Sequence, residues 1–355
     1  MNSTATRSEA VTTLQKAGPR RGNLLIVVRA LKWFAIAIMT LIILGVAYQT
    51  LATEADKRAY SPRGQLYTVN GHHIHLYCVG EGSPTVILEA GGYAESLWWY
   101  RIQNQLAEHT QVCAYDRPGL GYSEPTTLSR DPITIVGELR ALLNEAGINP
   151  PYVLAGHSLG GILVRIYADQ YPDDVSGLVL VDSAALRPAH FNSDAEFNEW
   201  KSGNDMLQVV VWAMSRLGLV RLTGSGDFSA WGYPPEIVPE LVALHSTNQA
   251  FDTYYAEGFP VRHELNEAAA VAQDFGGLPL AILWAGEQPL HNPADLELFE
   301  QIKQEIAAYS TNSVTHTVEG ADHGSILGSE QYAQQVSDVI LDVIETAQTG
   351  EPLAG

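Results

Sequence analysis

Short apolar runs recur along the chain, and most are followed by a polar or glycine-containing turn and a stretch with helical spacing. Patterns of buried strands lie at 85–90, 111–116, 152–155, 177–182, 278–284 and 313–318. Helical spacing occupies 96–108, 131–146, 294–309 and 330–346, and it also follows residue 158. This alternation predicts a mainly parallel sheet with helices on both faces.

Two alternating segments, 65–69 and 74–78, precede these runs and flank Asn70-Gly71. Asn-Gly predicts a hairpin because both turn residues must take positive φ, so the expected sheet has eight strands. After Ser183 the alternation stops, and 186–275 contains helical pieces without a convincing strand. We therefore expect a helical insert between two core segments, 65–185 and 276–349, and a flexible tail at 350–355.

The N-terminus forms a separate unit. Residues 33–52 carry no charge, and about 20 apolar residues suffice to cross a bilayer. Six basic residues and one acidic residue precede this run. The positive-inside bias predicts a cytoplasmic leader at 1–32, a transmembrane signal anchor at 33–52, a linker at 53–64 and an extracytoplasmic body. The alternative is a signal peptide cleaved near Ala52, which would leave a secreted protein.

Charge and cysteine content narrow the class of protein further. The chain of 355 residues has a net charge of −20, and beyond residue 52 it holds 14 basic and 39 acidic residues. Such an acidic body repels phosphate backbones, which argues against nucleic-acid binding. The two cysteines, Cys78 and Cys113, can pair in an exported body, and two buried free thiols are the alternative.

The sequence Gly-His-Ser-Leu-Gly at 156–160 lies where a buried strand meets a helix. It fits the pattern G-x-S-x-G, in which the serine occupies a strained turn and the flanking glycines let neighbouring elements approach closely. The N-terminus of the following helix favours developing negative charge. We therefore interpret Ser158 as a nucleophile.

A nucleophilic serine needs a base, and His323 is the best-placed histidine. It follows the last strand among small residues and comes last in chain order. His157 is expected to point away from Ser158, and His316 lies within a strand. Three more histidines adjoin the hairpin turn, where no carboxylate or cysteine accompanies them in sequence. We interpret them as a polar strand face and not as a metal site: His72, His73 and His75.

Residues 65–346 resemble serine hydrolases of the α/β-hydrolase superfamily. The resemblance rests on the motifs above together with Gly91-Gly92, the stretch 116–123 and Asp322-His323. The resemblance implies the α/β-hydrolase fold with a helical cap at 186–275. It also implies esterase- or lipase-like activity on a small ester or lipid-like substrate, without a metal or cofactor. In that fold the second and fourth strands are antiparallel neighbours, which favours a disulfide between Cys78 and Cys113.

The third member of the triad stays open. Its usual place in the family is the loop after the penultimate strand, but this loop reads Gly-Glu-Gln-Pro at 286–289, with proline where aspartate is common. Glu287 and Asp295 lie nearby. Asp182 follows the strand after the nucleophile helix, and some lipases of the superfamily take their acid from that strand. We favour Asp182 over Glu287.

The backbone of the predicted strand-to-helix turn at Ser158, here called the elbow, also indicates an oxyanion hole. One donor is expected to be the N–H of Leu159, directly after the nucleophile. The resemblance places the other in the loop after the third strand, where we choose Gly92. Together these groups predict ester cleavage through an acyl-enzyme.

Other functions remain open at the level of the sequence. A cofactor-free perhydrolase or an acyltransferase uses the same triad, and a membrane-tethered binding protein can occupy an inactivated hydrolase scaffold. The serine at position 158, where an epoxide hydrolase or a dehalogenase carries aspartate, argues against those two activities.

Overall fold

The computed structural model describes residues 21–183, 206–257 apart from 208 and 225, 268, 270–288 and 293–354. Its centre is one eight-stranded sheet with the strand order β1-β2-β4-β3-β5-β6-β7-β8. β1 pairs with β2 and β2 with β4 in the antiparallel sense, and all other neighbours are parallel. The predicted eight-stranded, mainly parallel sheet is confirmed.

The strands are β1 (Gln65–Val69), β2 (His72–Val79), β3 (Thr85–Glu89), β4 (Val112–Tyr115), β5 (Tyr152–His157), β6 (Val175–Val181), β7 (Leu280–Ala285) and β8 (Ser313–Val318). The helices that cover them are α2 (Tyr100–Leu106), α3 (Pro132–Glu145), α4 (Leu159–Gln170), α10 (Pro293–Ala307), α11 (Ser325–Gly328) and α12 (Glu330–Thr349). Two 3-10 turns add η1 (Ser96–Trp99) and η2 (Pro172–Asp174).

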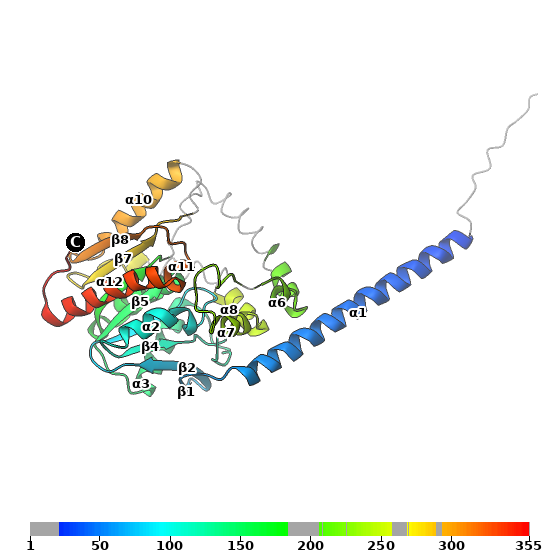
Figure 1. Cartoon of the computed structure of the whole chain (residues 1–355), viewed down its shortest axis with the longest axis horizontal. Coiled ribbons are helices and arrows are strands. Elements are labelled where there is room, and N and C mark those ends of the chain that lie inside the picture. The colour runs from blue at the N-terminus through cyan, green and yellow to red at the C-terminus, as the bar shows by residue number, and fades with distance from the viewer. Residues whose placement is uncertain are drawn as a thin grey trace, which may run out of the picture.

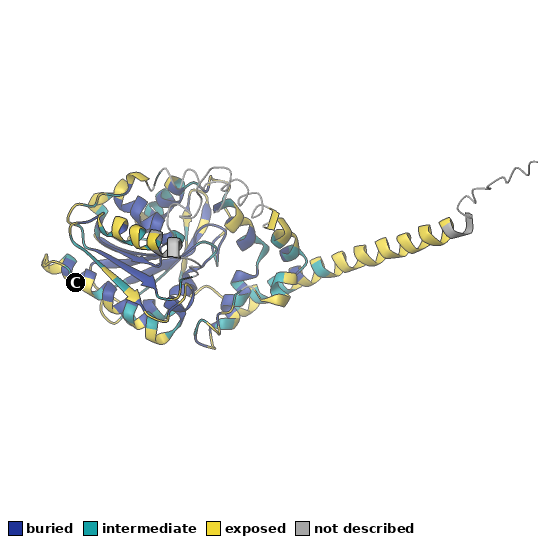
Figure 2. Cartoon of the chain, turned by 90° about the horizontal axis from the view of Figure 1, so that it is seen from above, coloured by how far each residue is buried: buried dark blue, intermediate teal, exposed yellow. Residues whose placement is uncertain are grey.

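Each face of the sheet has its own hydrophobic core. Along β5, Val153 and Ala155 face the core that α2, α11 and α12 cover. Tyr152 and Leu154 face the opposite core, which α3, α4 and α10 cover (Figure 1). Because both faces are covered, the central strands are continuous apolar runs instead of alternating ones, and Figure 2 shows them buried between helices with exposed outer surfaces.

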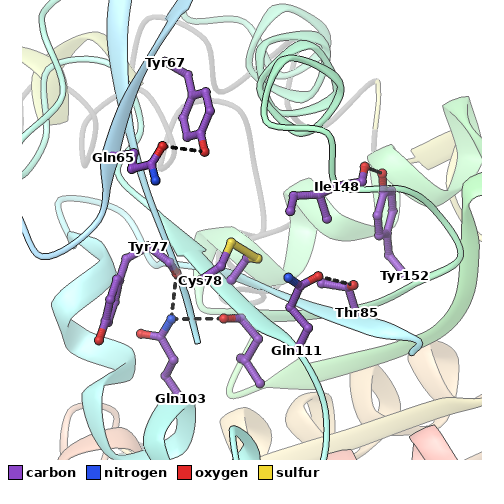
Figure 3. The surroundings of a disulfide bond; sticks show 11 residues. Gln65, Tyr67, Tyr77, Cys78, Thr85, Gln103, Gln111, Ile148 and Tyr152 are labelled. Atoms are coloured by element: carbon purple, nitrogen blue, oxygen red, sulfur yellow. Dashed lines mark hydrogen bonds between the residues drawn. A yellow bond between two sulfur atoms is a disulfide. The ribbon is translucent and has the colours of Figure 1, made fainter. Parts of the chain in front are cut away.

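A disulfide joins Cys78 of β2 to Cys113 of β4, which are directly opposite in the antiparallel register. Figure 3 shows it beside the Gln103 side chain, whose Nε2 donates to the carbonyl oxygens of Tyr77 at 2.8 Å and Val112 at 3.3 Å. The amide therefore bridges the same two strands from the α2 side. In the described structure the cysteines are thus paired and not free.

The N-terminal helix α1 (Arg21–Ala59) is one continuous helix of 39 residues that projects from the body (Figure 1). By length and composition it could cross a membrane, and its most apolar stretch is not buried in the body. The stretch expected as a linker, 53–64, is helical through Ala59. The last turns of α1 pack on the insert between β6 and β7: Gln49 Nε2 donates to the Ser246 carbonyl at 2.7 Å.

The insert between β6 and β7, predicted as a cap, consists of helices and turns in its described part. It contains the helical residues 209–216, α6 (Leu219–Thr223), α7 (Val238–His245) and α8 (Asn248–Glu257), and the described part includes no strand. The stretches 184–205 and 258–267 lie outside the described residues. At the other end, the tail is not wholly free, because the Leu353 N–H donates to Asn312 Oδ1 at 2.9 Å and the Leu353 side chain packs on the core.

Candidate active site

Ser158 occupies a sharp turn between β5 and α4, with φ 53° and ψ −119°. Positive φ is strained for a residue with a side chain, and it presents the hydroxyl at the carboxyl edge of the sheet. The flanking glycines are needed for space: an added Cβ at Gly160 would lie 2.3 Å from the Glu89 carbonyl oxygen, and one at Gly156 would lie 2.3 Å from the Gly160 carbonyl oxygen. The Ser158 N–H donates to the Val181 carbonyl at 3.1 Å, which ties the elbow to β6.

Asp182 directly follows β6 and faces the histidine predicted as the base. Its Oδ2 accepts a hydrogen bond from His323 Nδ1 at 2.5 Å. Burial opposes ionisation of Asp182, but the hydrogen bond and charge of His323 and the N–H of Ala285 hold the pKa of this carboxyl below its ordinary value. The Asp182 side chain is only 6% exposed, whereas that of His323 is 56% exposed. The imidazole is therefore fixed on one side and open on the other.

The Ser158 hydroxyl makes no hydrogen bond to any other residue that the structure describes. The preceding residue, His157, contacts the histidine loop, because the His157 and His323 ring centroids lie 4.5 Å apart. Hydrogen bonds between nucleophile and base are often long in ligand-free sites and tighten when substrate binds.

His157 has a contact that its expected orientation did not suggest. Its Nε2 donates to the carbonyl oxygen of His323 at 3.0 Å, so the ring supports the loop that carries the base. Burial, followed by the nearby His323, lowers the pKa of His157 to about 3, which keeps the ring neutral at physiological pH. A signal for this contact was present in the sequence, since His157 adjoins the elbow, but the loop it reaches lies 166 residues further along the chain.

The loop after β7 does not bring a carboxylate to His323. Glu287 is exposed and lies at the loop surface, and only its backbone N–H is held, by the Ala321 carbonyl at 2.8 Å. The next residue, Gln288, turns inward, and its Nε2 donates to Asp182 Oδ1 at 2.8 Å and to the Ala285 carbonyl at 3.0 Å. The side chain of Asp295 lies outside the described residues. Sequence reasoning missed Gln288, although it occupies the loop in which the family's acid usually lies.

Gln288 is therefore expected to position the acid. Replacing Gln288 by alanine removes one donor from the Asp182 carboxylate, and we expect kcat for an ester to fall about 10-fold with KM unchanged, since a hydrogen bond to a charged group contributes about 1.5–3 kcal/mol. Gln288→Glu should lower kcat further because it places a second carboxylate beside Asp182. Steady-state kinetics measure both effects. Gln334→Ala is the matched control, because Gln334 donates to Asp338 at 2.8 Å on an exposed helix face.

Gly92 and Leu159, the residues predicted to supply the oxyanion donors, lie close together. A Cβ added at Gly92 would lie 3.6 Å from Leu159 Cδ2. Leu159 is the first residue of α4, where helix geometry leaves the N–H without an intrahelical acceptor. Within the described residues, neither the Leu159 N–H nor the Gly92 N–H donates a hydrogen bond. Neither predicted donor is therefore engaged by an acceptor in the described part of the chain.

A buried arginine supports the loop that carries Gly92. Arg117 is 1% exposed and donates to the carbonyl oxygens of Ala90 and Gly91, each at 2.7 Å. Its guanidinium also binds two buried carboxylates, Glu89 of β3 at 2.7 Å and Glu257 of α8 at 3.0 Å. Burial alone would lower the pKa of Arg117, but Glu257 and Glu89 raise it, so the group stays charged. The stretch 116–123 contributed to the family resemblance, but its sequence did not predict this role.

The histidines beside the hairpin turn do not form the polar face that we expected. Each faces a carboxylate from another segment: His75 Nδ1 lies 2.8 Å from Asp116, His73 Nδ1 lies 2.9 Å from Glu124, and His72 Nε2 lies 3.5 Å from Glu138. No carboxylate accompanies these histidines along the sequence, but the fold brings carboxylates to them from distant parts of the chain. Among the described residues, no three metal-ligating side chains gather in one place.

Comparison with known proteins identifies the family. A model of the alpha/beta hydrolase fold matches residues 84–327, and the chain therefore belongs to the alpha/beta hydrolase family. An uncharacterized protein of Schizosaccharomyces pombe is 29% identical over 49% of this chain. The match covers 37% of that relative, and 38% and 47% of two uncharacterized Bacillus subtilis proteins, so it spans less than half of each.

Solved structures show the same fold. A thermophilic esterase from Thermogutta terrifontis superposes with a TM-score of 0.57 at 19% identity, covering 79% of this chain and 98% of the esterase. The epoxide hydrolase CorEH superposes with a TM-score of 0.58 at 22% identity, covering 79% of this chain and 98% of its own. The family and fold support a hydrolase.

Proposed function

We propose that this protein is a serine hydrolase that cleaves carboxylic esters through a triad of Ser158, His323 and Asp182. The observation that carries the proposal is the buried Asp182 carboxylate, hydrogen-bonded to His323 Nδ1 beside a serine on a strained strand-to-helix turn. A carboxylate, an imidazole and a hydroxyl in this order form the charge arrangement that activates a serine.

Each group has a distinct task in the proposed reaction. Asp182 holds the His323 proton on Nδ1, which leaves Nε2 free to accept the Ser158 proton as Oγ attacks the acyl carbon. The N–H groups of Leu159 and Gly92 bind the resulting oxyanion. His323 then protonates the departing alkoxide, and the same histidine activates water to release the acyl group from Ser158.

A fluorophosphonate probe tests the nucleophile directly. We expect the wild-type chain to be labelled covalently, and Ser158→Ala to remain unlabelled, because the probe reacts only with an activated serine hydroxyl. Mass spectrometry of a digest locates the adduct. Ser183→Ala is the matched control, since Ser183 lies beside the elbow, donating to the Ser158 carbonyl at 3.4 Å, and should leave labelling intact. A wild-type chain that stays unlabelled would instead favour a binding protein on a hydrolase scaffold.

We also propose that α1 anchors the catalytic body on the extracytoplasmic side of a membrane. The apolar exposed helix and the basic residues at its N-terminal end support this topology. The disulfide supports it independently, because disulfides persist in oxidising compartments.

A further inference from the structure

We propose that the exposed apolar surface of the insert docks onto the lipid bilayer that α1 spans. This surface, here called the cap face, consists of Met206, Leu207, Val209, Val210, Trp212, Leu219 and Leu222. Their exposed fractions run from 39% at Leu219 to 70% at Met206. A cluster of large apolar side chains of this kind on a soluble body marks an interaction surface. The inference rests on the proposed membrane anchor.

The cap face has a composition suited to lipid. Residues 206–224 contain no acidic residue, although the chain has 40. The two basic residues in the stretch are both paired, Arg216 with Asp252 and Arg221 with Asp56 at 2.5 Å. Docking this face therefore buries apolar side chains without stripping water from an unpaired charge of its own. In a chain with this many acidic residues, a surface that faces water would be expected to carry aspartate or glutamate in this stretch.

The contact with α1 fixes where this surface lies. The Gly45 backbone meets Leu217 so closely that an added Cβ would lie 2.8 Å from the Leu217 carbonyl oxygen. Tyr48 packs against Gly218, and Arg221 of α6 binds Asp56 near the end of α1. These contacts join α1 to the very segment that carries the cap face. Figure 1 shows α6 and α7 on the side of the body from which α1 projects.

The position along α1 of the contact between Gly45 and Leu217 brings the cap face to the bilayer surface. The charge-free run of α1 between Lys32 and Glu54 is about 31 Å long at 1.5 Å per residue, close to the hydrocarbon thickness. Gly45 lies inside this run, about 10 Å before Ala52. Shifting the span toward the N-terminus would instead bring Arg29 and Lys32 into hydrocarbon, which is unfavourable. The segment that touches Gly45 must therefore reach the lipid interface.

Site-directed fluorescence tests the proposal on the full chain. The two native cysteines are joined in a disulfide, so an introduced cysteine is the single reactive thiol. We would place an NBD label at Leu207→Cys and reconstitute the chain in phosphatidylcholine vesicles with and without doxyl-labelled lipid. Leu41→Cys in α1 is the lipid reference, and Leu128→Cys, which is 41% exposed on the body, is the aqueous control. We expect the label at 207 to show the blue shift and quenching of the label at 41.

The outcomes separate this inference from the anchor and from the activity. A label at 207 that behaves like the label at 128, while the label at 41 is quenched, keeps the anchor and overturns the docking of the cap face. A blue shift at 207 without quenching by doxyl lipid means that protein covers the face, which also overturns it. An unquenched label at 41 overturns anchor and docking together.

A kinetic comparison gives a second readout. The double variant Leu207→Glu, Leu222→Glu should lower hydrolysis of an ester embedded in vesicles about 10-fold, which equals about 1.4 kcal/mol, and leave hydrolysis of dissolved p-nitrophenyl acetate unchanged. Leu128→Glu should change neither rate. Equal loss on both substrates would show damage to the site and contradict docking, whereas a wild-type chain inactive on both would contradict the proposed hydrolase instead.

Discussion

Replacing Asp182 by asparagine is expected to lower kcat for an ester about 10⁴-fold, the loss that the same change causes in a serine protease triad. The isosteric amide keeps the shape of the side chain but removes the negative charge that faces His323 Nδ1 at 2.5 Å. It can also donate to Nδ1 and so favour the wrong tautomer, in which Nε2 is already protonated. Steady-state kinetics on p-nitrophenyl esters measure the change.

Glu287→Gln is the matched control for this prediction. Glu287 was the other carboxylate that the sequence offered, but it is exposed and lies at the surface of the loop after β7. We expect the variant to keep wild-type kcat within about 2-fold, since exposed surface changes have small effects. If Asp182→Asn retains activity and Glu287→Gln loses it, the triad is completed by the loop after β7, and the assignment of Asp182 is wrong.

The second large effect is expected at Arg117. Arg117→Met would leave Glu89 and Glu257 buried without their common counter-ion, and breaking such a buried ion pair from one side typically costs about 3–5 kcal/mol. Burial already raises the pKa of Glu89 against the influence of Arg117, so the variant should make this carboxyl still harder to ionise. Urea unfolding monitored by circular dichroism measures the free energy of unfolding.

Two further variants make this result specific. Arg140→Met breaks a pair with Asp174 in which the arginine side chain is 44% exposed, and we expect a cost below about 1 kcal/mol. Arg117→Lys keeps the positive charge but loses the planar guanidinium that reaches the carbonyl oxygens of Ala90 and Gly91. We therefore expect its free energy of unfolding to fall less than that of Arg117→Met, while kcat for an ester still falls. An Arg117→Met chain that unfolds at the wild-type urea concentration would contradict the stabilising role of Arg117.

Local patterns in the sequence predicted the strands, the main helices and the turn at Ser158. Strand and helix periods, together with Asn70-Gly71, predicted all eight strands, and the end residues of β8 match its predicted range. The turn at Ser158 was predicted in the same way, because the pattern G-x-S-x-G is complete within five consecutive residues, 156–160. These features depend on residues close together in the chain, so no tertiary information was needed.

The parts that sequence reasoning missed depend on contacts between distant segments. Gln288 reaches Asp182 across 106 positions, and Arg117 reaches Glu257 across 140. A glutamine in a loop and an arginine after a strand carry no periodicity that identifies a partner. The helical continuation of α1 through Ala59 was also missed, and a contact with the insert, that of Asp56 with Arg221, supports the helix there.

Because the last turns of α1 pack on the insert through Gln49 and Asp56, the inclination of α1 in the proposed membrane anchor also inclines the catalytic body. Transmembrane helices tilt when their apolar length exceeds the local hydrocarbon thickness. In a thinner bilayer the tilt angle of α1 from the bilayer normal would increase, and the eight-stranded sheet would tilt with it. For an anchored chain of this shape, membrane thickness thus sets the angle at which the carboxyl edge of the sheet, with Ser158, faces the lipid surface.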